Sequence, residues 1–292
     1  MRPTTYRMPA KAGTYHFYPL SCIHWPVGRK GLLERWVKTV KEDPNAVALL
    51  MGDVLDLART RFRNHVRGYT ADRNSQEGFD DYSSQLVEEV GNILMPVREK
   101  LIGNICGNHY WEDVQGVNSE QRIADFLDIP YLGPFGVARI DFVTATTANK
   151  SGSKARGNVT IVAHHKSSSG VASTVGSEAN RLEKFGKKWD ANIICLGHTH
   201  RAAVFENDAV WGISTKGSPT PFLKPKLLMA CGTLMDGINL EGEIAKKNRH
   251  LPHYAEEAGL TPMVAGWPVA NITIKRNDAG TMDIGITGHV IR

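Results

Sequence analysis

Short apolar runs alternate along the chain with amphipathic segments, in which apolar residues recur at the spacing of a helix. Residues 15–23 form the first apolar run, which predicts a strand. Residues 30–42 have the helical spacing and are followed by Asp-Pro-Asn, which predicts that the helix stops there. Residues 46–51 are entirely apolar and predict a buried strand. Such an alternation indicates an α/β fold.

The alternation continues through the middle of the chain. A second helix is expected at 84–100, interrupted at Pro96, and is followed by a strand at 101–106. Residues 119–128 resemble a capped helix that starts with Ser119. The remaining expected elements are paired strands at 137–147 and 158–165, a helix at 177–189, and strands at 192–198, 211–215, 226–232, 268–276 and 282–291.

Composition adds limits to this picture. With 292 residues, 41% of them hydrophobic and 22% charged, the chain can bury a sizeable core. It has neither an apolar run long enough to cross a membrane nor a recognisable secretion signal, so we expect an intracellular, cytoplasmic protein. The four cysteines lie far apart and are expected to be reduced thiols: Cys22, Cys106, Cys195 and Cys231.

The formal charge of +5 and the pI of about 9.0 favour anionic partners such as phosphate esters or nucleic acid. Solubility alone explains most of these charges. The arginines in the segment 59–81 are more suggestive, because guanidinium groups suit phosphate oxygens; the alternative is a solvated basic loop. The candidate substrate-binding residues are Arg59, Arg61 and Arg63.

Polar side chains follow five of the predicted strands at the point where each strand ends. Open α/β sheets place their sites just beyond the carboxyl ends of such strands. Most of these motifs alone have an ordinary explanation as a turn, although two imidazoles two residues apart, as in Gly-His-Thr-His, rarely occur in a turn by accident. Five such strand ends in one chain are hard to attribute to coincidence. The residues concerned are His24, Asp53 and Asp56, Asn108 and His109, His164 and His165, and His198 and His200.

These blocks read Gly-Asp-x-x-Asp, Gly-Asn-His, a lone histidine and Gly-His-x-His, and together they resemble the calcineurin-like metallophosphoesterase superfamily, in its bacterial and phage-type branch. The resemblance covers about residues 15–235. It implies an α/β fold built as a two-layer β-sandwich flanked by helices, with two divalent metals at its rim. We expect one domain over 1–292, in which a β-rich C-terminal extension, 236–292, packs on the motif-bearing core.

The resemblance also implies roles for the strand-end residues. His24 and His200 would hold one metal, Asp53 would bridge both, and Asn108, His164 and His198 would hold the other, with His109 beside them at the leaving group. His164 is preferred over His165 by its place relative to the strand. Imidazole, amide and carboxylate ligands suit borderline divalent ions; manganese is expected first, and zinc, iron and cobalt also fit.

Two positions depart from the family pattern. Cys22 stands where the family has an aspartate; it either ligates the metal as a thiolate or is a buried structural thiol. The usual acidic neighbour of His109 is displaced by Tyr110 and Trp111, so Asp56 or Glu112 would have to orient the histidine.

The resemblance implies a metal-dependent phosphoric ester hydrolase that acts by metal-activated hydroxide attack, with His109 assisting the leaving group. Phosphodiesters are the leading substrate class, with nuclease activity on DNA or RNA as a favoured case. The alternatives are a small nucleotide or phosphomonoester phosphatase, or a weakened scaffold protein that keeps the fold. The sequence does not indicate the oligomeric state.

Overall fold

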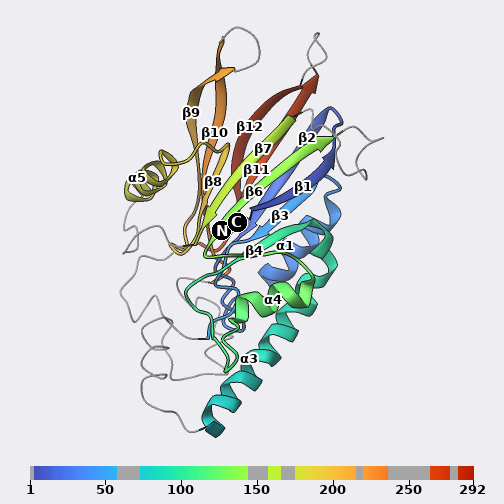
Figure 1. Cartoon of the computed structure of the whole chain (residues 1–292), viewed down its shortest axis with the longest axis vertical. Coiled ribbons are helices and arrows are strands. Elements are labelled where there is room, and N and C mark those ends of the chain that lie inside the picture. The colour runs from blue at the N-terminus through green and yellow to red at the C-terminus, as the bar shows by residue number, and fades with distance from the viewer. Residues whose placement is uncertain are drawn as a thin grey trace.

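The computed structural model describes residues 3–57, 73–143, 157–165, 175–214, 220–235, 264–276 and 282–292. Two six-stranded sheets pack face to face, with helices on their outer faces (Figure 1). The expected fold class, an α/β two-layer sandwich flanked by helices, is therefore confirmed.

The first sheet, called sheet I, is parallel through its central strands and antiparallel at one side. The C-terminal strands belong to this sheet, because β11 pairs directly with β2. In spatial order the strands are β12 (Met282–Ile291), β11 (Trp267–Arg276), β2 (Gly13–Leu20), β3 (Ala46–Leu50), β4 (Leu101–Ile105) and β5 (Tyr131–Gly133).

The second sheet, sheet II, contains a strand that the sequence pattern did not reveal. Strand β1 runs parallel to β6, but its side chains are mostly exposed or half-buried, so it has no apolar run to mark it. The expected pairing around 144–156 is confirmed as the antiparallel pair β6 and β7. In spatial order the strands are β1 (Pro3–Pro9), β6 (Phe135–Val143), β7 (Gly157–His164), β8 (Ile193–Leu196), β10 (Thr220–Cys231) and β9 (Ala202–Ser214).

Helices α1 (Lys30–Glu42), α3 (Arg73–Leu94) and α4 (Ser119–Leu127) cover sheet I, and α5 (Val175–Gly186) covers sheet II (Figure 1). Helix α3 begins well before the predicted start at 84. The sequence pattern missed its first turns because they are polar and show no apolar periodicity. It gives way at the predicted interruption to a 3₁₀ helix, η1 (Met95–Lys100), since Pro96 has no backbone N–H to donate.

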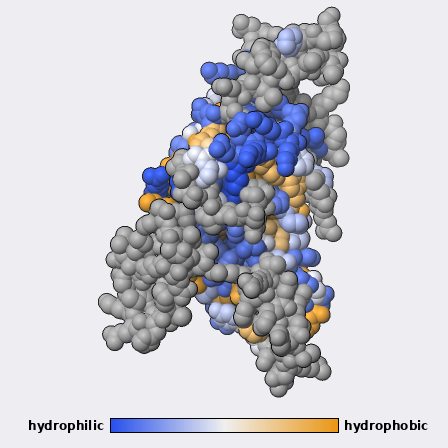
Figure 2. Space-filling view, turned by 90° about the vertical axis from the view of Figure 1, so that its left-hand side faces the viewer, coloured by the Kyte–Doolittle hydropathy of each residue, from blue (hydrophilic) through white to orange (hydrophobic). Residues whose placement is uncertain are grey.

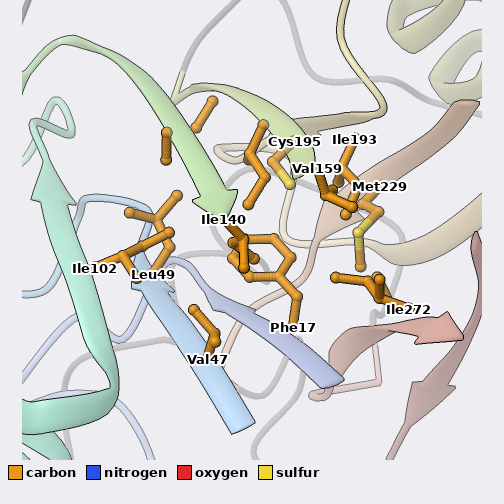
Figure 3. Packing of buried hydrophobic residues seen from close by; sticks show 14 of the residues in the cluster. Phe17, Val47, Leu49, Ile102, Ile140, Val159, Ile193, Cys195, Met229 and Ile272 are labelled. Atoms are coloured by element: carbon orange, nitrogen blue, oxygen red, sulfur yellow. The ribbon is translucent and has the colours of Figure 1, made fainter. Parts of the chain in front are cut away.

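The main hydrophobic core lies between the two sheets. Figure 3 shows Phe17 and Leu49 of sheet I facing Ile140 and other apolar residues of sheet II. Alternate residues of β3, such as Leu50, face the helices instead, so both faces of this strand are buried.

On the face of the molecule seen in Figure 2, by contrast, the described residues are mostly hydrophilic.

All four cysteines are free and buried, as expected. Among the described residues, no helix combines the length and the apolar character needed to cross a membrane.

Candidate metal centre

Five strands end at the same end of the sandwich, and the residues that follow them converge there. The potential ligand atoms of Cys22, His24 and His200 all lie within 4.8 Å of one another. Those of Cys22, Asp53 and His165 do so as well, so the two groups share the thiol. Residues from β2 and β3 of sheet I therefore meet residues from β7 and β8 of sheet II.

The backbone at this site is unusual. Only six non-glycine residues of the described chain have a positive φ, and five of them belong to the site; the sixth, Asp128, ends helix α4. Side chains other than glycine rarely adopt this conformation, and such strain gathers at functional sites. The five are Cys22 (52°), His24 (51°), Asp53 (52°), His198 (74°) and His200 (59°).

Backbone hydrogen bonds hold the first two loops together. The N–H groups of Cys22 and His24 donate to the carbonyls of Gly52 and Asp53, at 3.1 and 3.0 Å. The loop after β10 adds a further support, because the Leu234 N–H donates to the Cys22 carbonyl at 3.1 Å. The turn at Cys22 is thus fixed from both sheets.

Glycine is required where these loops touch. Gly52 has a φ of +79°, and a Cβ there would lie 2.4 Å from the Gly107 nitrogen. A Cβ on Gly107 would lie 2.0 Å from Asp53 Oδ1, and one on Gly197 would lie 2.5 Å from Ser21 Oγ. The glycine before each motif therefore provides room for close approach as well as freedom to turn.

Asp53 is the centre of the site and is fully buried. Its Oδ1 accepts the backbone N–H groups of Asn108 and His109, which brings the third loop against it. Its Oδ2 lies 2.8 Å from Nε2 of His165 and 3.9 Å from Nε2 of His24. Burial alone would raise the pKa of this carboxyl, but the neighbouring charges, that of His165 foremost, hold the pKa of Asp53 well below its usual value.

His24 and His200 point their Nε2 atoms at each other, 3.1 Å apart. Burial, together with the charge of His24, holds the pKa of His200 well below its usual value. A neutral imidazole leaves a lone pair for a cation, so this pair has the form of two metal ligands.

His165 lies in the site, in the place for which the sequence analysis preferred His164. It is buried, its Nδ1 donates to the Met51 carbonyl at 2.7 Å, and its Nε2 faces Asp53. A backbone carbonyl that binds the second ring nitrogen is the usual way in which a metal-binding histidine is oriented.

His164 faces the other side of sheet II. Its ring is half-buried and lies 5.8 and 5.9 Å from the rings of Phe135 and Phe185. Strand alternation explains the difference, because Ile161 and Ala163 face the core between the sheets and His165 continues their face. The structure thus places His165, and not the preferred His164, beside Asp53, and the alternation was the sequence signal that distinguished the two.

Two further expected ligands, His198 and Asn108, also lie at this site. The rings of His198 and His165 lie 5.5 Å apart, and Asn108 is placed by its bond to Asp53. The candidate substrate-binding residues Arg59, Arg61 and Arg63 lie outside the described residues.

Asp56 is the acid that contacts His109. Its Oδ1 lies 2.6 Å from Nδ1 of His109 and 3.4 Å from Nδ1 of His24. Although burial acts in the opposite direction, the bond to His109 and that to His24 hold the pKa of Asp56 well below its usual value. Of the two acids considered from the sequence, Asp56 is therefore placed to orient the histidine.

Two helices contribute residues that the sequence analysis missed. Arg181 of α5 donates through Nη2 to Glu178, at 2.6 Å, and to the carbonyl of Gly197, at 3.3 Å. Glu120 of α4 accepts the backbone N–H of Val54, next to Asp53, at 2.9 Å. No local motif marks these residues, since a carboxylate in the first turn of a helix, where Glu120 stands, is common.

The donors fit a divalent cation. Asp53 Oδ2 and His165 Nε2 are buried and lie 2.8 Å apart, and among the described residues neither has a hydrogen-bond partner besides the other. Carboxylate and imidazole are both ligands of divalent ions, so a cation bound here would contact both atoms. Burial, and then the charge of Asp53, raise the pKa of the Cys22 thiol, so Cys22 would need a cation beside it to ionise.

No family model and no curated protein sequence matches the chain. Among solved structures, Vps29 from Chaetomium thermophilum matches at 12% identity over 94% of this chain and 96% of its own, with a TM-score of 0.38. A predicted phosphoesterase from Streptococcus pneumoniae matches at 10% identity over 95% and 100%, with a TM-score of 0.31. A novel phosphatase from Mycoplasma pneumoniae matches at 11% over 96% and 94%, with a TM-score of 0.36. The matching structures thus include a predicted phosphoesterase and a phosphatase, at similarities too low to carry a conclusion about this chain's activity.

Proposed function

We propose that the protein is a metal-dependent phosphoesterase that hydrolyses phosphodiesters with two divalent ions, manganese first among them. The observation that carries this proposal is the convergence of histidine, aspartate and cysteine ligand atoms, from both sheets and on strained backbone, into two groups of three that share Cys22 and whose atoms lie within 4.8 Å of one another in each group. A cluster with a purely structural role would not need this strained backbone.

The ligands divide around Asp53. Cys22, His24 and His200 would hold one ion, Asn108, His165 and His198 the other, and Asp53 would bridge them. When bound, such a pair of ions activates water and stabilises the charge on phosphoryl oxygens.

His109 supplies the proton chemistry of the proposed reaction. Its Nδ1 lies 2.6 Å from Asp56 Oδ1, a contact that keeps the ring oriented. His109 also lies beside His24, with ring centroids 4.8 Å apart, so it stands next to the proposed ions. From that position it would donate a proton to the leaving oxygen.

The proposed substrate class is inferred from the net positive charge of the chain. The basic balance of the chain suits a phosphodiester backbone, and the arginines of the segment 59–81 would add contacts to phosphate. DNA and RNA are the favoured phosphodiesters, and phosphomonoesters or small nucleotides are the second candidate.

The test is hydrolysis of bis(p-nitrophenyl) phosphate by the full chain with Mn²⁺. We expect turnover that Asp53→Asn abolishes and that His109→Ala lowers about 10²–10⁴-fold, the usual contribution of a positioned acid. His164→Ala is the matched control and should retain wild-type turnover. A folded wild-type protein with no Mn²⁺-dependent turnover of this diester or of p-nitrophenyl phosphate would overturn the proposal.

The second arm offers single-stranded DNA, double-stranded DNA and cyclic nucleotides to the same enzyme. A nuclease should lose affinity for its substrate steeply as salt rises, because phosphate contacts release counterions. Preference for cyclic nucleotides or monoesters, with little salt dependence, would favour the small-substrate alternative.

A further inference from the structure

Glu120 is a fully buried carboxylate that belongs to no part of the proposed reaction. It lies in the first turn of α4, whose N-terminal cap is the side chain of Asn118. Its Oε1 accepts the backbone N–H of Val54 at 2.9 Å, and its Oε2 accepts the side-chain amide of Asn104 at 3.0 Å. Helix α4 thus contacts the ends of β3 and β4 through one side chain.

The contact with Val54 lies directly behind the residue that would bridge the two metals. Asp53 has its left-handed φ of 52°, a conformation that a non-glycine residue does not hold unaided. On one side, the carbonyls of Asp53 and Val54 accept N–H groups from His24 and Trp25, at 3.0 and 2.8 Å. On the other side, Glu120 holds the N–H of Val54. The 52–54 turn is thus held by hydrogen bonds on both sides.

The second carboxylate oxygen, Oε2 of Glu120, binds strand β4, which leads to the loop that carries Asn108. Asn104 also donates to the main-chain carbonyl of Glu120, at 2.9 Å, so strand and helix are doubly bonded. Strand β4 then leads to Asn108, whose N–H binds Asp53. Both oxygens of Glu120 therefore act on segments that carry proposed ligands. Within the part of the chain that the structure describes, the polar partners of Glu120 are the Val54 N–H and Asn104, and no lysine or arginine forms an ion pair with it.

We propose that Glu120 is a positioning residue, which holds the 52–54 turn so that Asp53 presents its carboxylate to both metals. This inference rests on the proposed metal centre. It assigns to α4 a part in metal affinity that acts through the Val54 N–H and not through contact with the ions.

The test compares variants of the full chain, stripped of metal with a chelator and titrated with Mn²⁺ by calorimetry. Glu120→Ala should weaken Mn²⁺ binding about 10–100-fold, the usual cost of removing a group that orients a ligand. Glu120→Gln loses the acceptor for Asn104 at Oε2 but keeps an oxygen for Val54, and Asn104 keeps its bond to the main-chain carbonyl of residue 120, so Mn²⁺ affinity should stay within about threefold of wild type. Asp141→Ala removes a buried carboxylate from β6, away from the site, and should lower thermal stability without weakening Mn²⁺ binding.

A second readout needs no metal. Hydrogen exchange of the metal-free protein should be faster in the peptide 51–57 of Glu120→Ala than in wild type, and should be restored in Glu120→Gln. If Glu120→Ala does not fold, Glu120→Asp replaces it, because the shorter side chain should not reach Val54. Weaker Mn²⁺ binding by Asp than by Gln supports the role, and equal binding overturns it.

The outcomes separate this role from the proposed function. A wild-type protein that binds no Mn²⁺ removes the metal centre, and the role of Glu120 falls with it. A wild-type protein that binds Mn²⁺, together with a folded Glu120→Ala of unchanged affinity, overturns the role of Glu120 alone.

Discussion

At the scale of single residues, two neighbouring histidines show how strand alternation decides chemistry. His165 faces Asp53, and His164 faces Phe135 and Phe185 on the outer side of the same sheet. We predict that His165→Ala weakens Mn²⁺ binding by more than about 100-fold, a larger loss than removing an orienting group causes, and that His164→Ala leaves it unchanged. Calorimetric titration of the two variants checks this. Equal losses in both would show that the ring at 165 is not a ligand.

Cys22 allows a spectroscopic prediction. If its sulfur ligates, Co²⁺ added to the metal-free protein should give a near-ultraviolet charge-transfer band of a thiolate ligand, which Cys22→Ser should lose. Cys22→Asp should also lose the band and shift metal preference towards Mn²⁺, since a carboxylate is the harder ligand. Cys195→Ala, another buried thiol, is the control that should keep the band. A band that survives in Cys22→Ser would make Cys22 a structural thiol.

The sequence could predict which residue types gather at the site, because each follows an apolar strand whose end is set by burial. It could not show which atoms meet. Whether Asp56 or Glu112 contacts His109 depends on the path of the loop after β4. The contact of Glu120 with Val54 depends on how α4 packs on the sheet. Such contacts join residues far apart in the chain, and no local pattern encodes them.

At the scale of elements, the loops are placed by glycines that admit close approach. We predict that Gly107→Ala disables the site, because its Cβ would lie 2.0 Å from Asp53 Oδ1 and the loop would have to move. Mn²⁺ affinity and diester hydrolysis should both fall, as calorimetry and the assay will measure. Gly31→Ala in helix α1, where a Cβ meets nothing within 4 Å, should instead keep both and add up to about 1 kcal/mol of stability. A Gly107→Ala enzyme with wild-type Mn²⁺ affinity would contradict this placement of the loop.

Helix α1 has a C-terminal cap supplied by a distant lysine. Lys100 Nζ donates to the carbonyls of Val40 and Lys41, at 2.7 and 3.0 Å, where the helix would otherwise leave them unpaired. We predict that Lys100→Met lowers the free energy of unfolding by about 1–2 kcal/mol in denaturant titrations. Lys38→Met, on the exposed side of the same helix, should cost less than about 0.5 kcal/mol. Equal losses would mean that Lys100 contributes no cap.

Elements were predictable where burial left a periodic pattern. Helix α1 and strand β12 have the expected bounds, since α1 alternates buried and exposed positions at the helical period and β12 alternates half-buried and exposed positions at the strand period. Strand β1 and the first turns of α3 were missed because their side chains are largely polar or exposed, and their structure depends on contacts with distant elements. Polar elements of this kind are set by tertiary contacts rather than by local pattern.

At the scale of the whole molecule, the proposed metal centre joins the two sheets at one end. Cys22, His24 and Asp53 come from sheet I, and His165 and His200 come from sheet II. A ligand that binds the folded chain and not the unfolded one stabilises it by about 2.7 kcal/mol at a free concentration 100 times its Kd. Here the bound ions would add a link between two layers that also contact through the apolar core and through loop hydrogen bonds, so their effect should extend over the whole fold.

We therefore predict that saturating Mn²⁺ raises the melting temperature of the metal-free protein by about 5 °C or more, and that a chelator reverses the shift. The gain should rise with the logarithm of free Mn²⁺ and should vanish in Asp53→Asn, which removes the residue that both proposed sites share. Near- and far-ultraviolet dichroism should report the same midpoint, because ions that bind residues of both sheets stabilise both layers together. A shift of equal size in Asp53→Asn would mean that Mn²⁺ stabilises the protein from another place on its surface.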